Sequence, residues 1–444
     1  MPDGAPALAR RIGPFDATMI VMGGIVGSGI FVTPAIVARA AHSPVLIVAA
    51  WLVGGTAALL GAFIYAELSS ARPEVGGQYA YLREAMHPLV AFLYGWALLL
   101  VIETGGMAAT AITFARYFRE LVPLALSDGA LAAVAMALLT AINCFGVRAG
   151  SSAQSALMII KICALAALIA TGLLFGGGGA TSRGSGGSIA GLGAALVPVL
   201  FAYGGWQTSC FVAGEMRDPR RDLPRALLAG VAGVIVLYPL VALACLHTLG
   251  AADLARTGVP ALDVMTRVLG RRGAVAISAG IAVSTLGFLS QSILTAPRVY
   301  FAMADDRLFF RAVAHVHPRT RVPVVAIVLQ GVLTIVIALS GTFEVILNYV
   351  VSIDFVFFAL TAACIFVFRR RGARGSFSMP GYPITTIAFI CVCAAVVVST
   401  FRADPAHSIA GLAITLAGIP VYLLWRARAA RDATSTPREQ SAPP

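Results

Sequence analysis

The stretch from Thr18 to Pro34, TMIVMGGIVGSGIFVTP, is an apolar run with Gly27-Ser28-Gly29 near its centre. A helix that crosses a bilayer must satisfy its backbone polar groups internally, because lipid offers them no hydrogen-bonding partner. Three helix-weakening residues at mid-depth therefore need a reason. One interpretation is an unwound helix whose freed amides and carbonyls bind a small charged solute. The other is close packing of helices through small residues, and this stretch alone does not decide between them.

The composition excludes a soluble protein. Of 444 residues, 59% are hydrophobic and only 12% are charged, with a mean hydropathy of +0.88. A soluble globular domain carries about twice that share of charge. The first apolar run follows Arg10 and Arg11 but exceeds a signal-peptide core, and many further spans come after it. We therefore expect it to be retained as the first membrane helix.

Windows of about 20 apolar residues predict an all-α polytopic membrane protein with twelve transmembrane helices. The expected spans are 15–38, 45–69, 89–117, 129–147, 153–175, 189–213, 225–249, 274–303, 323–341, 344–368, 383–402 and 407–425. With the N-terminus (1–14) placed in the cytoplasm, 22 arginines fall on the inner side and nine on the outer side. The positive-inside rule then predicts a multi-pass protein of the plasma (cytoplasmic) membrane, the inner membrane of a bacterial cell, with both termini in the cytoplasm.

The spans divide into two blocks. A Gly/Ser-rich segment, 176–188, predicts a flexible external linker after five helices (15–175), and a second block of five follows (189–368). Helices 11 and 12 (383–425) lie outside the two blocks, and the polar tail 427–444 has too few apolar residues to fold, so we expect it to be disordered.

The second block also opens on an interrupted helix. The sixth span, LVPVLFAYGGWQTSCFVAGE, is broken at mid-depth by Tyr203-Gly204-Gly205-Trp206. Two glycine-broken spans that open two five-helix blocks are the pattern of an inverted repeat with a binding site near the bilayer midplane. The pair favours the binding interpretation of Gly27-Ser28-Gly29.

Three motifs in the same order carry a family resemblance. They are GSGIF in the first span, FAYGGW in the sixth followed by Glu215 and DPRRDLPRA, and STLGFLSQSILTAPRVYFAMADDRLFF in the eighth. Together they resemble the amino acid-polyamine-organocation (APC) superfamily, and within it the L-amino-acid-transporter-like branch and its bacterial permease relatives. The resemblance covers nearly the whole chain. It implies a LeuT-like 5+5 inverted repeat with broken helices 1 and 6, which moves amino acids by alternating access.

An amino acid presents a carboxylate and an ammonium on one carbon, and two adjacent broken helices can offer amides to one and carbonyls to the other. The amides expected at the carboxylate are those of Gly27, Ser28, Gly29 and Ile30. The carbonyls expected at the ammonium lie near Ile25, Phe201 and Ala202. Glycine also lets the substrate backbone approach closely. The resemblance implies the same positions.

Four further residues of the sixth span complete the predicted substrate site: Tyr203, Gly204, Trp206 and Gln207. In the family, the aromatic residue that matches Phe201 acts as a gate over the substrate; the alternative is that Phe201 and Trp206 are packing aromatics. Relatives often carry a polar residue near the side-chain pocket at the position of Gln207.

Lys161 is the only lysine among 32 basic residues, and it lies inside the fifth span. A buried ammonium needs partners, and the freed carbonyls of the first span are candidates. The resemblance implies that this lysine replaces the cation of sodium-coupled members, which makes transport sodium-independent. Ser284 and Thr285 could add oxygens, and Tyr238 matches a tyrosine that the branch places nearby. The alternative is that Lys161 has only a structural role and stabilises the packing of neighbouring helices.

Glu103, in the middle of the third span, is the other deeply placed ionisable residue. It could carry a proton, contact the substrate, or sit protonated between helices. Asp354 and Glu67 are weaker candidates. Glu215 is expected to pair with the arginines at 217–225.

Other functions find little support in the sequence. The seven cysteines lie in or beside spans without a His/Cys grouping, so neither a disulfide framework nor a metal site is expected. Because the six histidines lie near span ends and no Ser–His–acid grouping occurs at mid-depth, an embedded enzyme is disfavoured and no cofactor is expected. A channel would need continuous stripes of polar residues along its pore, and the predicted spans show none. The basic residues behind the net charge of +12 lie in short loops between spans. The orientation of the protein in the membrane therefore explains them better than nucleic-acid binding does.

The open contest is between modes of transport. The resemblance and Lys161 favour an exchanger or uniporter, whereas Glu103 favours a proton symporter. A polyamine or other cationic substrate would need more acidic residues in the site.

Heteromeric eukaryotic members of the family bind an ancillary glycoprotein through a cysteine between spans three and four. The corresponding loop, Arg119 to Gly129, has no cysteine, so no covalent partner subunit is expected.

Overall fold

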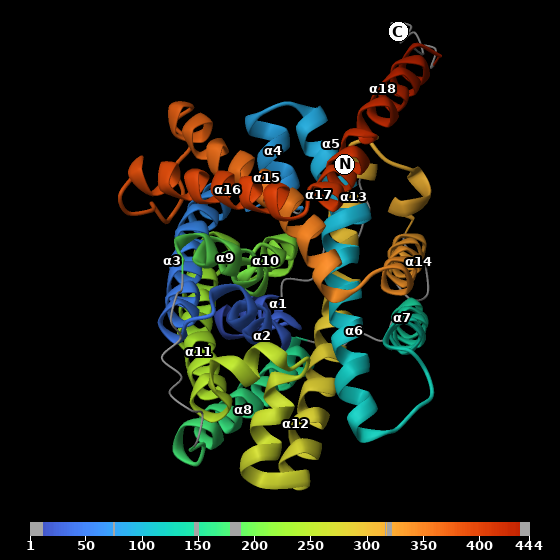
Figure 1. Cartoon of the computed structure of the whole chain (residues 1–444). Coiled ribbons are helices and arrows are strands. Elements are labelled where there is room, and N and C mark those ends of the chain that lie inside the picture. Colours follow the sequence, from blue (N-terminus) through green and yellow to red (C-terminus); the bar gives the residue numbers. More distant parts are fainter. Residues whose placement is uncertain are drawn as a thin grey trace, which may run out of the picture.

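A computed structural model describes residues 12–73, 76–145, 151–177, 188–315, 317 and 322–435, and throughout this part the regular elements are helices (Figure 1). The first eleven residues and most of the predicted linker 176–188 lie outside the described residues. Proline stands in the first turn of α1, α3, α5, α11, α12, α13 and α17. Its fixed φ suits a helix start, and its missing N–H would have no partner there.

The first block holds five spans. Their helices are α1 (Pro14–Ile25) with α2 (Gly29–Ala41), α3 (Pro44–Ala71), α5 (Pro88–Ala97) continued by a π-helical turn (Leu98–Ile102) into α6 (Glu103–Leu121), α7 (Asp128–Cys144) and α8 (Ser151–Leu174). A short helix, α4 (Gln78–Ala85), lies between the second and third spans. The block therefore opens on a broken helix, as predicted.

The second block repeats that order. Its helices are α9 (Ile189–Tyr203) with α10 (Thr208–Phe211), α11 (Pro219–Arg256), α12 (Pro260–Thr295) with α13 (Pro297–Asp305), α14 (Val324–Ser340) and α15 (Phe343–Arg370). The last two spans are α16 (Ile384–Ala403) and α17 (Pro405–Leu416) with α18 (Gly418–Ser435).

Each predicted span is occupied by a helix or by a pair of helices. Among the described residues, eight helical segments are long and apolar enough to cross a membrane, the bent pair α1 and α2 forms a ninth span, and α7 and α14 are shorter apolar helices. The broken pair α9 and α10 makes the twelfth. The protein is thus an all-α polytopic membrane protein with broken first and sixth helices.

Three helices extend well beyond their predicted spans. Glycines in the left-handed region, Gly250 (φ 76°) and Gly270 (φ 63°), turn the chain so that short helical pieces continue α11 to Arg256 and begin α12 at Pro260. At the other end of the chain, α18 runs to Ser435, so the tail expected to be disordered from 427 begins as helix. Its alanines and arginines are strong helix formers, which the low hydropathy of this segment conceals.

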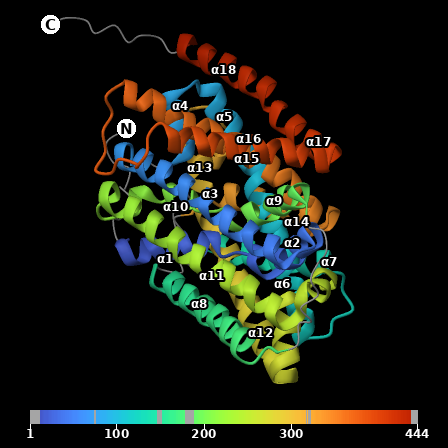
Figure 2. The same cartoon turned by 60° about the vertical axis from the view of Figure 1, so that its left-hand side comes forward.

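The two broken helices lie inside the bundle. Figure 1 shows α1 and α2 near the centre of the molecule, with α9 and α10 beside them, and Figure 2 shows α11 crossing them. α2 packs against α9 and α11, while α1 packs against α11 and α8. The apolar core therefore surrounds the residues that the sequence marks as functional.

Candidate functional site

The first break separates α1 from α2 at a bend of 40°. The amide of Val26 still donates to Met22 O at 2.7 Å, and that of Gly27 turns back to Ile25 O at 2.8 Å. Within the described chain, the next three amides, those of Ser28, Gly29 and Ile30, donate to no backbone carbonyl. They are the first N–H groups of α2, and the partial positive charge of a helix N-terminus gathers there.

Side chains from two other helices hold the carbonyls of this break. Lys161 Nζ, on α8, donates to Val26 O at 2.8 Å, and Tyr238 Oη, on α11, donates to Ile25 O at 3.0 Å. Lys161 is only 3% exposed. The structure thus brings together Lys161, Tyr238 and the first-span carbonyls.

The eighth span approaches the lysine through an aromatic ring and not through the predicted hydroxyls. The ring centre of Phe288 lies 5.8 Å from Lys161 Nζ, within reach of a cation–π interaction. Thr285 Oγ1 bonds to carbonyls of its own helix, at 2.8 Å to Ile281 O and 3.0 Å to Ala282 O. Ser284 Oγ is buried without a hydrogen-bond partner among the described residues. Neither hydroxyl serves as an oxygen ligand of the ammonium, because their helix turns Phe288 toward it.

The second break lies between Tyr203 and Thr208 and is held by its own side chains. Gly205 has φ +107°, a conformation that glycine adopts without strain. Its amide donates to Gln207 Oε1 at 3.0 Å, and its carbonyl accepts from Thr208 Oγ1 at 2.8 Å. Gln207 therefore folds back on the break, which differs from a side chain extended into a substrate pocket.

Glycines let the two breaks touch. A Cβ on Gly205 would lie 2.1 Å from Gly24 O, and one on Gly29 would lie 2.7 Å from Ala202 Cα. A Cβ on Gly204 would meet Phe201 O at 3.2 Å and Leu200 O at 3.6 Å. Close packing and unwinding are thus both present, and the same glycines serve both. Sequence reasoning missed Gly24 as a contact of Gly205, although its place in a Gly-Gly pair was a signal.

The aromatic residues of the second break have different surroundings. Phe201 is half-buried, with its ring edge-on to Phe343 at a centroid distance of 5.9 Å. Trp206 is 1% exposed and stacks on Phe358 at 5.1 Å. Tyr203 is buried, and its hydroxyl donates to Trp51 O at 3.1 Å. Trp206 and Tyr203 therefore pack α9 and α10 against their neighbours, and only the Phe201 ring is partly open.

Glu103 begins α6 directly after the π-helical turn Leu98–Ile102, and such turns often occur at functional sites. It lies seven residues before Thr110, on the same face of α6, and Thr110 Oγ1 is 3.1 Å from Ser28 Oγ in the first break. At 1.5 Å per residue, Glu103 is about 10 Å along the helix from that contact. Ser292 of α12 interacts with its carboxyl group.

Asp354, on α15, faces the same buried region as Glu103. It is 8% exposed, and its Oδ1 has no hydrogen-bond partner among the described residues. The two carboxyl groups interact electrostatically with each other. Burying two like charges near one another is costly, so both acids are candidates for a functional role.

The remaining acids form ion pairs near span ends. Both oxygens of Glu67 bind Arg369, each at 2.7 Å, and Glu67 Oε2 also accepts from Met379 N at 2.7 Å, which is a structural role. Glu215 bonds to Arg298 Nε at 2.6 Å. The expected pairing of Glu215 with the arginines at 217–225 is therefore wrong, since the turn after α10 directs the carboxylate toward α13.

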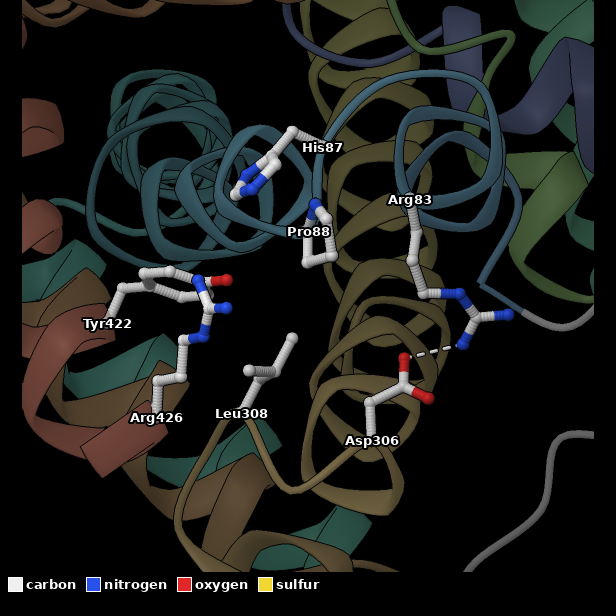
Figure 3. A pocket seen from close by; sticks show the side chains of 7 residues that line it. All are labelled: Arg83, His87, Pro88, Asp306, Leu308, Tyr422 and Arg426. Atoms are coloured by element: carbon white, nitrogen blue, oxygen red, sulfur yellow. Dashed lines mark hydrogen bonds and ion pairs between the residues drawn. The ribbon is translucent and has the colours of Figure 1, made fainter. Parts of the chain in front are cut away.

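A cavity of about 360 Å³ lies away from both breaks, lined by residues of α4, α18, the start of α5 and the segment after α13 (Figure 3). The predicted site itself is tightly closed: Ser28 is 2% exposed and Gln207 is 5% exposed.

A bundle of apolar helices, whose two broken helices meet with free amides beside a buried lysine, has the architecture of a solute transporter. Residues 12–424 match the family model described as "Amino acid permease". The chain therefore belongs to the amino acid permease family.

Curated relatives align over almost the full chain. The serine/threonine exchanger SteT of Bacillus subtilis is 32% identical over 426 residues, covering 94% of this chain and 96% of the relative. Large neutral amino acids transporter small subunit 2 and Asc-type amino acid transporter 1, both from Homo sapiens, are each 29% identical. These alignments cover 95% of this chain and 81% and 84% of the respective relatives. The protein is a multi-pass membrane transporter of amino acids.

Proposed function

We propose that the protein is a sodium-independent exchanger of neutral amino acids, which holds the substrate backbone between the two broken helices. The observation that carries the proposal is the contact of Lys161 Nζ with Val26 O at 2.8 Å. In this proposal the lysine supplies a positive charge to the first break, where an unwound helix would otherwise need a bound cation to balance its carbonyls.

The substrate carboxylate binds the amides of Ser28, Gly29 and Ile30 in this proposal. These amides have no other backbone partner in the described chain, and a helix N-terminus attracts anions. The substrate ammonium binds carbonyls at the C-terminal end of α9, near Phe201 and Ala202. That end carries partial negative charge, and Ala202 lies against Gly29, so both halves of a zwitterion find partners close together.

Phe201 serves as the gate. Its ring is half-buried at the edge of the second break and contacts Phe343 on α15. A rotation of this ring could cover or uncover a small molecule without moving the break. Trp206 and Tyr203 have packing roles, because both are buried against neighbouring helices.

The preference for neutral substrates and for exchange rests on the relatives and on the residues of the breaks. The relatives' names describe a serine/threonine exchanger and transporters of large neutral amino acids. No Asp, Glu, Lys, Arg or His occurs in the segments Ile25–Ile30 or Phe201–Gln207, so nothing in the breaks themselves would balance a charged substrate side chain. An enzymatic activity is not part of this proposal.

Counterflow in proteoliposomes tests the exchange mechanism. Vesicles loaded with unlabelled serine, threonine or leucine should take up the labelled amino acid faster than empty vesicles, with or without a pH gradient. Uptake that ignores internal amino acid but follows the proton gradient would refute exchange. A thermal-shift screen against the twenty amino acids would name the substrate class, since a ligand that binds the folded state stabilises it.

Proton symport is the second candidate. It is supported by two buried acids that interact with each other, Glu103 of α6 and Asp354 of α15. Glu103 lies on the face of α6 that leads to Ser28. Glu103→Gln should abolish gradient-driven uptake if this pair carries the proton, and should leave counterflow intact if the protein is an exchanger.

We further propose a plasma-membrane location with both termini in the cytoplasm, following the distribution of arginines. The two repeats comprise residues 15–175 and 189–368. The segment Arg119–Gly129 has no cysteine, so a disulfide to an ancillary subunit cannot form there.

A further inference from the structure

The cavity of about 360 Å³ brings together basic groups from segments far apart in the sequence. It is lined by Arg83 of α4, His87 and Pro88 at the start of α5, Asp306 and Leu308 after α13, and Tyr422 and Arg426 of α18. Figure 3 shows Arg83 and Asp306 on one side of it, and His87, Tyr422 and Arg426 on the other. Neither broken helix contributes a lining residue.

The single acid of this cavity is already neutralised. Asp306 Oδ2 accepts from Arg83 at 2.5 Å and from the Tyr79 hydroxyl at 2.7 Å. Arg426 is exposed and forms no ion pair with any described residue. The lining therefore carries a net charge of +1 with His87 neutral, counting Arg83, Arg426 and Asp306. An anion would balance it.

His87 adds a fixed hydrogen-bond donor. As the N-cap of α5, it accepts a bond from Leu89 N through Nδ1 at 3.1 Å. A neutral imidazole whose Nδ1 accepts must carry its proton on Nε2. The first amides of α5 are engaged by His87 itself, since Leu89 N bonds to its ring and Val90 N to its carbonyl. Side chains, and not the helix terminus, are therefore the available donors.

The surroundings favour a lipid as the source of the anion. Next to Tyr422, the side chains of Leu423 and Leu424 are 55% and 63% exposed. Trp425 stacks on Phe309 and meets Phe310 edge-on, and aromatic residues of this kind gather at membrane–water interfaces. Basic pockets between helices at that level suit phosphate headgroups, while exposed leucines suit acyl chains.

We propose that this cavity binds a phosphate group, supplied by the headgroup of an anionic phospholipid and held chiefly by Arg426, with His87 Nε2 as a further donor. The occupant ties α18 to the inner ends of the third and eighth spans. The site is separate from the amino acid site and does not depend on the proposed exchange mechanism.

The test compares lipid binding by the full-length protein and two variants. Native mass spectrometry should detect retained phosphatidylglycerol in preference to phosphatidylcholine. Arg426→Gln should weaken that retention about tenfold, as expected for a lost hydrogen bond to a charged group. Arg374→Gln removes an equal charge from an exposed arginine that does not line the cavity, and should retain lipid like the wild type. Equal losses in the two variants, or no preference for phosphatidylglycerol, would overturn the proposal.

Two further arms identify the donor and the source of the phosphate. His87→Asn keeps an N-cap acceptor for α5 but removes the Nε2 donor, so it should weaken binding while the unfolding temperature stays near that of the wild type. Inorganic phosphate at millimolar concentration should not displace the lipid. Stabilisation by inorganic phosphate that requires Arg426, together with no lipid preference, would retain the phosphate site but refute the lipid source.

Discussion

The two helix breaks are maintained in opposite ways. At the first, the carbonyls of Ile25 and Val26 bond to side chains from α11 and α8. At the second, Gly205 bonds through its amide and carbonyl to Gln207 and Thr208, which are its own neighbours in sequence. The first break depends on other helices, whereas the second is held locally. A motion of α8 or α11 would therefore act on the substrate site through the first break.

The largest effect should come from closing the gap between the breaks. Gly205→Ala would place a Cβ 2.1 Å from Gly24 O and would force a side chain into φ +107°. Because the atoms that the new Cβ would meet belong to the backbone and cannot rotate away, we expect transport to fall about a hundredfold or more. Uptake per inserted protein is the measurement. Gly193→Ala, on the preceding helix α9 with no atom within 4 Å of the new Cβ, should transport normally, and equal activity of the two variants would refute the contact.

Removing the cross-helix cation should have the next largest effect. Lys161→Met keeps much of the side-chain volume but leaves Val26 O without its bond. The loss of a charged hydrogen bond costs about 1.5–3 kcal/mol, so counterflow should fall by about tenfold or more. A variant with lower thermal stability but wild-type counterflow would place Lys161 in a purely structural role.

Tyr238→Phe tests the neutral bond to the first break. It removes the hydroxyl that donates to Ile25 O, which is worth about 1 kcal/mol. We expect counterflow to fall about fivefold. Tyr203→Phe is the matched control, because its hydroxyl donates at a similar distance to Trp51 O of α3 and not to a carbonyl of the first break. If Tyr203→Phe reduced counterflow as much as Tyr238→Phe, the difference between the two breaks would not hold.

The smallest effect should follow from weakening the second break. Gln207→Ala removes the acceptor of the Gly205 amide. Gly205 is half-buried, so water can replace part of that bond, and we expect a change of only about twofold to threefold in counterflow. A loss as large as that of Lys161→Met would show that the second break is not locally secured.

Much of the bundle could be predicted from the sequence, because lipid burial forces long apolar helices. The breaks were predictable for the same reason: glycines at mid-span are conspicuous in Thr18–Pro34 and in the sixth span. The partner of Lys161 was also predictable, since a single buried ammonium needs freed carbonyls.

The remaining features depend on side-chain directions that the sequence does not encode locally. The orientation of Phe288 toward Lys161 depends on the rotation of α12, and the pairing of Glu215 with Arg298 depends on the turn after α10. The basic cavity joins segments from Arg83 to Arg426, so no single stretch signals it. The helix that continues to Ser435 is polar, and hydropathy alone does not reveal it.

The central claim is that Lys161 replaces a sodium ion at the first break. The most direct measurement is amino acid counterflow into proteoliposomes in sodium buffer and in buffer where choline replaces sodium. The account predicts equal initial rates for the wild type in both buffers. Uptake that requires sodium would contradict it, because a cation site already filled by an ammonium leaves no place for the ion.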